Sequence, residues 1–168
     1  MPLDLLQIRI LKTLAQSRSP ESVFAGGSVL HRHGFRLSDD QDIFHGAHVD
    51  VWSIAEADVC RLRDDGLDVD FALKHEGLVE AIVYSEEHGT SKIQWVEAGS
   101  YHFFGPVPDD ELGWRLHMAD IATGKVLAAG GRRQVRDYVD LTLIHQNILP
   151  LWHVLWAAPG KDASWSPL

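Results

Sequence analysis

The chain has 168 residues, is 45% hydrophobic and carries a formal net charge of −9. This length and apolar content are enough for one domain with a core, over residues 1–168. Its single cysteine, Cys60, excludes an internal disulfide, and no apolar run approaches the roughly 18 residues that a membrane helix needs. No charged-then-apolar leader with a small-residue cleavage site is visible, so a cytoplasmic protein without membrane contact is expected.

The first predicted elements are a helix and a short strand. Apolar residues spaced three or four apart over residues 3–17 favour an amphipathic helix, which ends before Pro20. Residues 23–25 are apolar and suit a buried strand, which Gly26 and Gly27 end.

Those glycines predict a phosphate-binding turn. Glycine tolerates positive φ and leaves the backbone N–H groups uncovered, so phosphate oxygens can approach them. Ser28 adds a hydroxyl, and a helix over residues 28–33 would add a positive N-terminal dipole. We therefore expect Gly26, Gly27 and Ser28 to cradle a triphosphate. Taken alone, Gly-Gly-Ser is also a common turn without a ligand.

Two carboxylates follow the turn with one residue between them. On a strand, Asp40 and Asp42 point to the same face, about 7 Å apart at roughly 3.3 Å per residue. Such a pair can hold Mg²⁺ or Mn²⁺ for transfer chemistry on phosphates. Arg36 and Ser38 immediately precede the pair and are expected to help bind a nucleotide. Asp39 is interpreted as a turn residue, and the plain alternative for the whole run is a solvated acidic loop.

The middle of the chain alternates between helical and strand patterns. The predicted fold class is α+β, a mixed or antiparallel sheet flanked by helices, with its core over residues 20–100. The pattern predicts a helix over residues 49–65 and strands over residues 40–44, 69–73, 78–85 and 92–97.

A second group of charged residues lies on a predicted helical segment over residues 120–145. The group consists of Lys125, Arg132, Arg136, Asp137 and Asp140. Arg136 and Asp140 are four residues apart and face the same way on a helix, while Gly130-Gly131 is expected to split that helix in two. Residues 110–168 are expected to form a helical C-terminal part. A solvated helix with ion pairs is the alternative interpretation.

The two groups together resemble a known family. Gly-Gly-Ser, an apolar pair and then Arg-x-Ser-x-Asp-x-Asp-x-Phe resemble the first motif of the DNA polymerase β-like nucleotidyltransferases, most closely the AbiEii/AbiGii abortive-infection toxins. Lys, Arg and then Arg-Asp-x-x-Asp-Leu resemble the C-terminal motif of those toxins. By position, the resemblance implies that Lys125 contacts nucleotide phosphates, that Asp140 supports catalysis, and that Arg136 is a further phosphate or ion-pair residue. It covers most of residues 20–145.

One position departs from the family pattern. Related transferases place a third carboxylate on a later strand beside the acid pair, and the residue here that aligns with it is Gln94. An amide can coordinate Mg²⁺ through its carbonyl but cannot serve as a general base. Nearby acids that could replace the third carboxylate are Asp68, Asp70 and Glu97, and Asp140 is a further candidate.

Histidine and basic residues add little to this picture. His31, His33, His45 and His48 lack the spacing of a metal motif and are expected at the surface or rim. Positive charge is concentrated at Arg32 with Arg36 and at Arg132-Arg133 with Arg136, so binding along a long RNA is disfavoured.

The resulting hypothesis is a toxin-like, Mg²⁺-dependent nucleotidyltransferase that moves a nucleoside monophosphate from a nucleoside triphosphate to an acceptor hydroxyl. Asp40, Asp42 and Asp140 are its expected catalytic residues. A tRNA end or a protein is the acceptor in the family, and the residues do not choose between them. The alternative is an inactive nucleotide-binding or interaction module of a toxin–antitoxin system. An antitoxin or a second copy of the chain is a possible partner, since tryptophans crowd the C-terminal residues.

Overall fold

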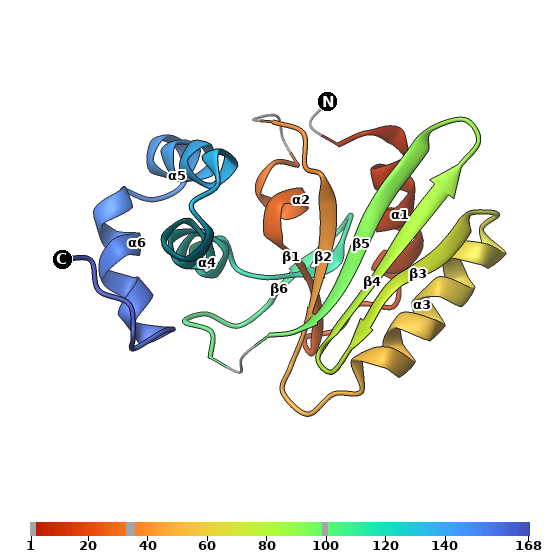
Figure 1. Ribbon diagram of the computed structural model, residues 1–168, viewed down its shortest axis with the longest axis horizontal. Helices are drawn as coiled ribbons and strands as arrows, with labels where there is room; N and C mark the ends of the chain where they lie inside the picture. The colour runs from red at the N-terminus through yellow and green to blue at the C-terminus, as the bar shows by residue number, and fades with distance from the viewer. Residues whose placement is uncertain (1–2, 33–35, 99–100) are drawn as a thin grey trace. The chain divides into compact units, whose positions relative to one another are not determined.

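The computed structural model describes residues 3–32, 36–98 and 101–168. The chain divides into two compact units, which we describe separately (Figure 1). Unit 1 comprises residues 1–100 and 106–116, and unit 2 comprises residues 101–105 and 117–168. A single domain over residues 1–168 stays a prediction. The expected surface position of His33 lies outside the described residues.

Unit 1 contains a seven-stranded sheet with the strand order β3-β4-β5-β2-β1-β7-β6. The β1–β7 and β2–β5 pairs are parallel and the other pairs are antiparallel, so the sheet is mixed, which confirms the predicted α+β fold class. The strands are β1 Ser22–Ala25, β2 Asp40–His45, β3 Asp68–His75, β4 Leu78–Ser85, β5 Gly89–Glu97, β6 Val107–Asp109 and β7 Gly113–Arg115.

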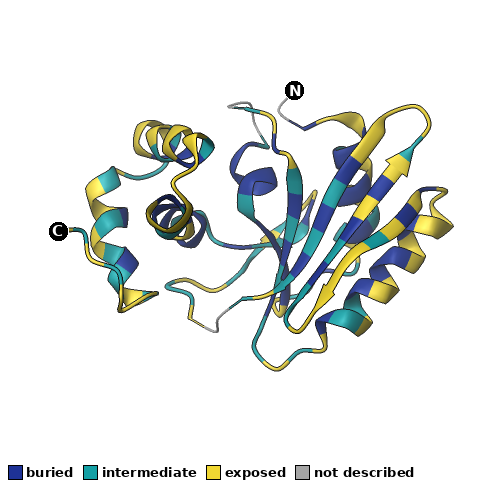
Figure 2. Cartoon of the chain, viewed as in Figure 1, coloured by how far each residue is buried: buried dark blue, intermediate teal, exposed yellow. Residues whose placement is uncertain are grey.

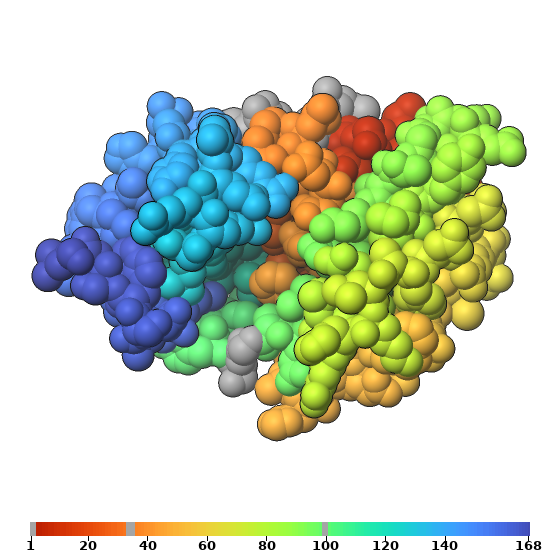
Figure 3. Space-filling model, viewed as in Figure 1, coloured from red at the N-terminus to blue at the C-terminus, as the bar shows by residue number. Residues whose placement is uncertain are grey.

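One face of this sheet carries the core of unit 1. Burial alternates along β2, β4 and β5, as Figure 2 shows, because successive side chains point to opposite faces. Helices α1 (Leu5–Ala15) and α3 (Val51–Asp64) contact β5 from the buried side. They lie behind the sheet in Figure 1, while side chains of β4 and β5 form the surface toward the viewer in Figure 3.

Most element boundaries in unit 1 are near the predicted ones. Helix α1 begins at an Asp4–Gln7 capping box, in which each side chain accepts a hydrogen bond from the other residue's backbone N–H. Helix α2 is different, because it spans Gly26–Leu30 and therefore includes the two glycines that were expected to precede it. With five residues it has little macrodipole to offer a phosphate.

Unit 2 is helical, and its first helix corrects one expectation. The helices are α4 Met118–Arg132, α5 Val135–Asn147 and α6 Leu151–Ala157, followed by the 3₁₀ turn η1 Ala158–Gly160. Helix α4 runs through Gly130 and Gly131 without a break and ends at Arg133, whose φ is 52°. Gly130 fits here because the indole of Trp165 packs against it, and a Cβ would lie 2.7 Å from Trp165 Nε1.

A buried carboxylate fastens the 101–105 loop to α4. Asp120 accepts hydrogen bonds from the backbone N–H groups of Phe103 and Phe104 at 2.9 and 3.1 Å. Lys161 Nζ lies 2.7 Å from Asp120 Oδ1. The loop therefore belongs to the helical unit although it lies between β5 and β6 of the sheet in sequence. Within the described ranges, every helix is too short or too polar to cross a bilayer.

Candidate functional site

The glycine turn lies directly against the acid strand. Strands β1 and β2 pair antiparallel with Ala25 opposite Asp42, which brings the turn at the end of β1 beside the start of β2. Gly26 has a φ of 66°, and a Cβ at this residue would overlap Asp42 Oδ2. A Cβ on Gly27 would lie 2.7 Å from Ser38 Oγ. The structure thus brings together two predicted groups of site residues that are more than ten positions apart in sequence.

Asp40 and Asp42 lie on the same face of β2. Both are half-buried, whereas Gln41 and Ile43, which alternate with them, are fully buried against the core. The side chain of Asp40 is 18% exposed, so a ligand can reach it. We define the acid face as the surface of β2, β5 and β4 on this side of the sheet.

Two further charged residues on the acid face were missed in the sequence. Asp40 is paired in register with Lys92 on β5, and Glu80 on β4 is paired with Gln94. Lys92 Nζ lies 3.6 Å from Asp40 Oδ2 and 3.9 Å from Glu80 Oε1. Gln94 Nε2 donates a hydrogen bond to Glu80 Oε1. Only the strand order, which no local pattern encodes, places these residues beside the acid pair.

The remaining predicted residues of unit 1 surround the turn. Ser38 Oγ donates to the carbonyl of Asp40 at 3.0 Å, and Gln7 Nε2 donates to the carbonyl of Ser38 at 2.7 Å. Arg36 Nη1 donates to the carbonyl of Leu37 at 2.7 Å. Ser28 is buried, and its hydroxyl donates to the carbonyl of Ala25 at 3.3 Å. A direct contact between Ser28 and a phosphate stays a prediction.

The donors on the acid face fit a magnesium ion that arrives with its substrate. Among the residues that the structure describes, no three His, Cys, Asp or Glu side chains are grouped to hold a metal on their own. Mg²⁺ is often bound by only one or two carboxylates, with substrate phosphates and water completing its coordination. Asp40 and Asp42 supply that number of carboxylates.

The predicted residues of unit 2 form two ion pairs between α4 and α5. Lys125 Nζ lies 2.7 Å from Asp140 Oδ2, and the carboxylate of Asp140 is fully buried. Arg132 donates two hydrogen bonds to Asp137, at 2.8 and 2.7 Å. These bonds hold the pKa of the Asp137 carboxyl below its usual range. Arg136, on the first turns of α5, is half-buried.

The predicted site residues are therefore divided between the two units. Unit 1 contains Gly26, Gly27, Ser28, Arg36, Ser38, Asp40 and Asp42, and unit 2 contains Lys125, Arg136 and Asp140. Each set is grouped within its own unit. Their action on one substrate stays a prediction.

Two histidines that were expected at the surface are buried instead. His31 and His45 are 0% and 2% exposed. Burial, together with the positive charge of Arg18, lowers the pKa of His45 to about 4. Arg18 itself forms a buried ion pair with Asp58 at 2.5 Å. Neither ring nitrogen of His45 has a hydrogen-bond partner among the described residues, which is why protonating it is costly.

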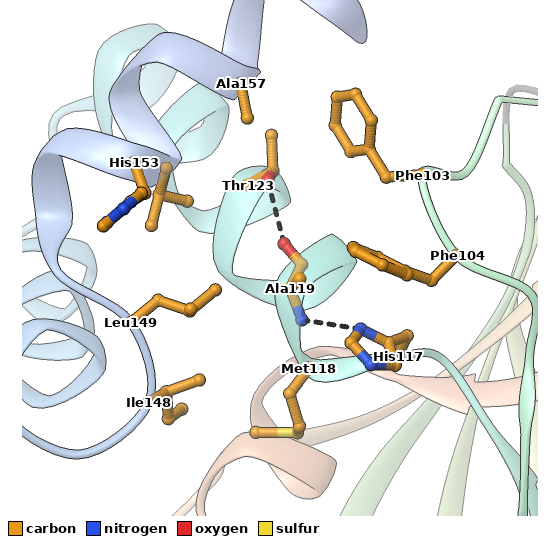
Figure 4. Close-up of a pocket in the computed structure, with 11 residues that line it drawn as sticks. Phe103, Phe104, His117, Met118, Ala119, Thr123, Ile148, Leu149, His153 and Ala157 are labelled. Carbon is orange, nitrogen blue, oxygen red and sulfur yellow. Dashed lines mark hydrogen bonds between the residues drawn. The ribbon is translucent and has the colours of Figure 1, made fainter.

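Unit 2 also contains a pocket of about 530 Å³ that none of the predicted site residues lines (Figure 4). Its walls are mostly apolar, with the imidazoles of His117 and His153 among them. Thr123 Oγ1 donates to the carbonyl of Ala119, and the Ala119 N–H donates to His117 Nδ1, so these polar groups are already engaged (Figure 4). The lining residues are Phe103, Phe104, His117, Met118, Ala119, Thr123, Ile148, Leu149, His153, Val154 and Ala157.

No family model and no curated protein sequence matches the chain. Among solved structures, the nucleotidyltransferase toxin MenT4 of Mycobacterium tuberculosis is similar with a TM-score of 0.65 and 19% identity, over 97% of this chain and 66% of the toxin chain. The chain has the nucleotidyltransferase fold. It spans slightly less than two thirds of the length of that toxin.

Two polymerases match this nucleotidyltransferase-fold chain less well. The Megavirus polyadenylate synthase matches with a TM-score of 0.46 and 10% identity, over 93% of this chain and 35% of its own. The Cid1 poly(U) polymerase, in a structure with MgGTP bound, matches with a TM-score of 0.42 and 14% identity, over 83% of this chain and 39% of its own. At these scores neither similarity carries weight for the site.

Proposed function

We propose that this protein is a toxin-like nucleotidyltransferase of the AbiEii/AbiGii type. It would move a nucleoside monophosphate from a nucleoside triphosphate to an acceptor hydroxyl, on a tRNA end or on a protein. The observation that carries the proposal is the contact between the glycine turn and the acid strand, where Gly26 leaves no room for a side chain beside Asp42. This contact puts the backbone of a glycine turn next to a carboxylate pair, an arrangement that suits a metal-bound triphosphate.

In this proposal, Asp40 and Asp42 hold Mg²⁺ or Mn²⁺ on the acid face. The bound metal would offset the negative charge of the phosphates and of the pentacovalent transition state. The backbone of Gly26 and Gly27 approaches the phosphate oxygens, and Arg36 adds positive charge. Ser38 packs against the turn, because a Cβ on Gly27 would lie only 2.7 Å from Ser38 Oγ.

We propose that Lys125 neutralises the triphosphate and that Asp140 acts mainly through Lys125. Asp140 is fully buried and lies 2.7 Å from Lys125 Nζ, so it can fix the direction of the ammonium group. Arg136 would contribute a further positive charge from the same helix as Asp140.

A second candidate function is an inactive nucleotide-binding or interaction module of a toxin–antitoxin system. It is favoured by Gln94, which stands in register with Asp42 where related transferases have an acid. Trp152 and Trp156 on α6 are 60% and 62% exposed, which suits contact with an antitoxin or a second copy of the chain. Such a module would bind a nucleotide without transferring it.

The two candidates are separated by incubation with α-labelled nucleoside triphosphates, Mg²⁺ and either total tRNA or cell-extract protein. The proposed enzyme labels one acceptor class, and Asp42→Asn abolishes the label because one metal carboxylate is lost. Asp39→Asn is the matched control, since Asp39 is an exposed aspartate outside β2, and it should label as the wild type does. Nucleotide binding without label in any acceptor would favour the inactive module.

A further inference from the structure

Gln94 stands between two carboxylates on the acid face. Strand β5 lies between β2 and β4, and Gln94 is in register with Asp42 on one side and with Glu80 on the other. All three residues are half-buried on the same face of the sheet. The orientation of the Gln94 amide therefore decides which of its two polar groups faces Asp42.

Glu80 determines that orientation. An ionised carboxylate only accepts hydrogen bonds, so the part of Gln94 that faces Glu80 has to be the NH₂ group. The structure has this bond, from Gln94 Nε2 to Glu80 Oε1. The amide oxygen is on the other branch of the side chain and is therefore not the group that faces Glu80. On the other side of Gln94 is β2, where Asp42 is its partner in register.

The positive charge of Lys92 stabilises the acidic side chains on the acid face. Its ammonium lies 3.6 Å from Asp40 Oδ2 and 3.9 Å from Glu80 Oε1, and therefore offsets repulsion between the two carboxylates. The side chain of Glu80 is only 23% exposed, so it packs against the sheet and does not extend into bulk solvent.

We infer that Glu80 is a positioning residue that aims the carbonyl oxygen of Gln94 at the metal site of Asp40 and Asp42. Gln94 then contributes a neutral oxygen donor where related enzymes have a carboxylate, and Glu80 acts through it. This inference rests on the proposed function. Partners that orient a metal ligand in this way typically change metal affinity by about 10- to 100-fold.

The test is the affinity for Mn²⁺, measured by electron paramagnetic resonance in the presence of a non-hydrolysable ATP analogue. Glu80→Ala removes the acceptor that orients Gln94 and should weaken Mn²⁺ binding by about 10- to 100-fold. Glu86→Ala removes an exposed acid just beyond the end of β4 and should leave the affinity unchanged.

An exchange variant keeps the inference testable if Glu80→Ala disturbs folding. In the double variant Glu80→Gln with Gln94→Glu, the introduced amide can donate to the introduced carboxylate, which now lies beside Asp42. The Mn²⁺ affinity of this double variant should be at least that of the wild type. Gln94→Glu alone places the introduced carboxylate opposite that of Glu80, and this variant should bind Mn²⁺ less well than the exchange variant.

The outcomes separate this inference from the proposal on which it rests. Wild-type Mn²⁺ affinity in Glu80→Ala, together with lost affinity in Asp42→Asn, would overturn the role of Glu80 and leave the proposed function standing. An exchange variant as weak as Glu80→Ala would overturn it too. Unchanged affinity in Asp42→Asn would remove both.

Discussion

Asp42 Oδ2 fills the space that a Cβ on Gly26 would need. Because Gly26 also has a φ of 66°, two independent constraints exclude a side chain at this turn. The contact couples the end of β1 to the start of β2, so that the phosphate turn and the metal carboxylates of the proposed enzyme form one structural feature.

We expect Gly26→Ala to abolish triphosphate binding and to destabilise the protein. The strained backbone alone costs on the order of 1–3 kcal/mol, and Asp42 has to move to relieve the overlap. The free energy of unfolding from urea titration and the affinity for an ATP analogue measure the two effects. Gly46→Ala is the control, since a Cβ there would meet no atom within 4 Å, and it should change neither. Normal nucleotide affinity in Gly26→Ala would contradict the proposed role of the turn.

The Lys125–Asp140 pair should show separable contributions to stability and to function. Asp140→Ala leaves a buried ammonium without its carboxylate, and such changes cost about 3–5 kcal/mol. Replacing both partners, as in Lys125→Met with Asp140→Leu, should recover most of that stability, because an apolar pair has no charge to desolvate.

Nucleotidyl transfer should nevertheless be absent from the double variant. Urea unfolding and transfer of α-label, measured on the same three proteins, test this difference. A stable double variant with wild-type transfer would show that the pair is only structural.

Stability should fall as the pH is lowered from about 6.5 to about 4 because His45 is buried in its neutral form. The pKa of His45 is about 4 in the folded protein and 6.5 for an unperturbed imidazole, so the unfolded state takes up the proton first. The contribution of neutral His45 to the free energy of unfolding is therefore complete above pH 6.5, and on the order of 3 kcal/mol of it is lost by pH 4. Thermal unfolding across this range should be less pH-dependent in His45→Leu.

The exposed His48, with a φ of 67°, supplies the control for the pH experiment. His48→Asn retains a residue that tolerates this backbone conformation and should keep the wild-type pH dependence. A His45→Leu protein with an unaltered pH dependence would place the titrating group elsewhere.

The two adjacent glycines of α4 should respond differently to alanine. A Cβ on Gly131 meets no atom within 4 Å, so Gly131→Ala should stabilise by up to about 1 kcal/mol through helix propensity. Gly130→Ala has to displace the Trp165 indole and should therefore gain less or lose stability. Urea unfolding followed by tryptophan fluorescence reports both effects, and equal stabilisation by the two changes would contradict the packing of Trp165 against α4.

Local patterns were sufficient for helices α1 and α3 and for strands β1 to β5. The alternation in β2 correctly predicted that Asp40 and Asp42 share a face, because a strand has a fixed period of two. The predicted helix break at Gly130-Gly131 was wrong because helix propensity depends only on the local residue, whereas Gly130 contacts Trp165, 35 positions away in sequence. The predicted surface positions of His31 and His45 were wrong for a similar reason, since the burial of a side chain depends on how the sheet assembles.

The acid face was only partly accessible from the sequence. Glu80 and Lys92 occupy ordinary positions in amphipathic strands, and their importance appears only when β5 is placed between β2 and β4. Strand order depends on pairing between distant segments and leaves no periodic signal in any one of them. The motifs around Asp42 and Lys125, by contrast, were predicted from residue order alone, and their action on one substrate stays a prediction.

The most direct test of nucleotidyl transfer compares triphosphates labelled at the α- and γ-phosphates. Transfer of a nucleoside monophosphate breaks the bond between the α-phosphorus and the bridging oxygen, so the acceptor gains the α-label and the γ-label leaves in pyrophosphate. We predict this result for the wild type and for Asp39→Asn, and neither label on the acceptor for Asp42→Asn. Transfer of the γ-label, or no labelled acceptor with the wild-type protein, would contradict the account.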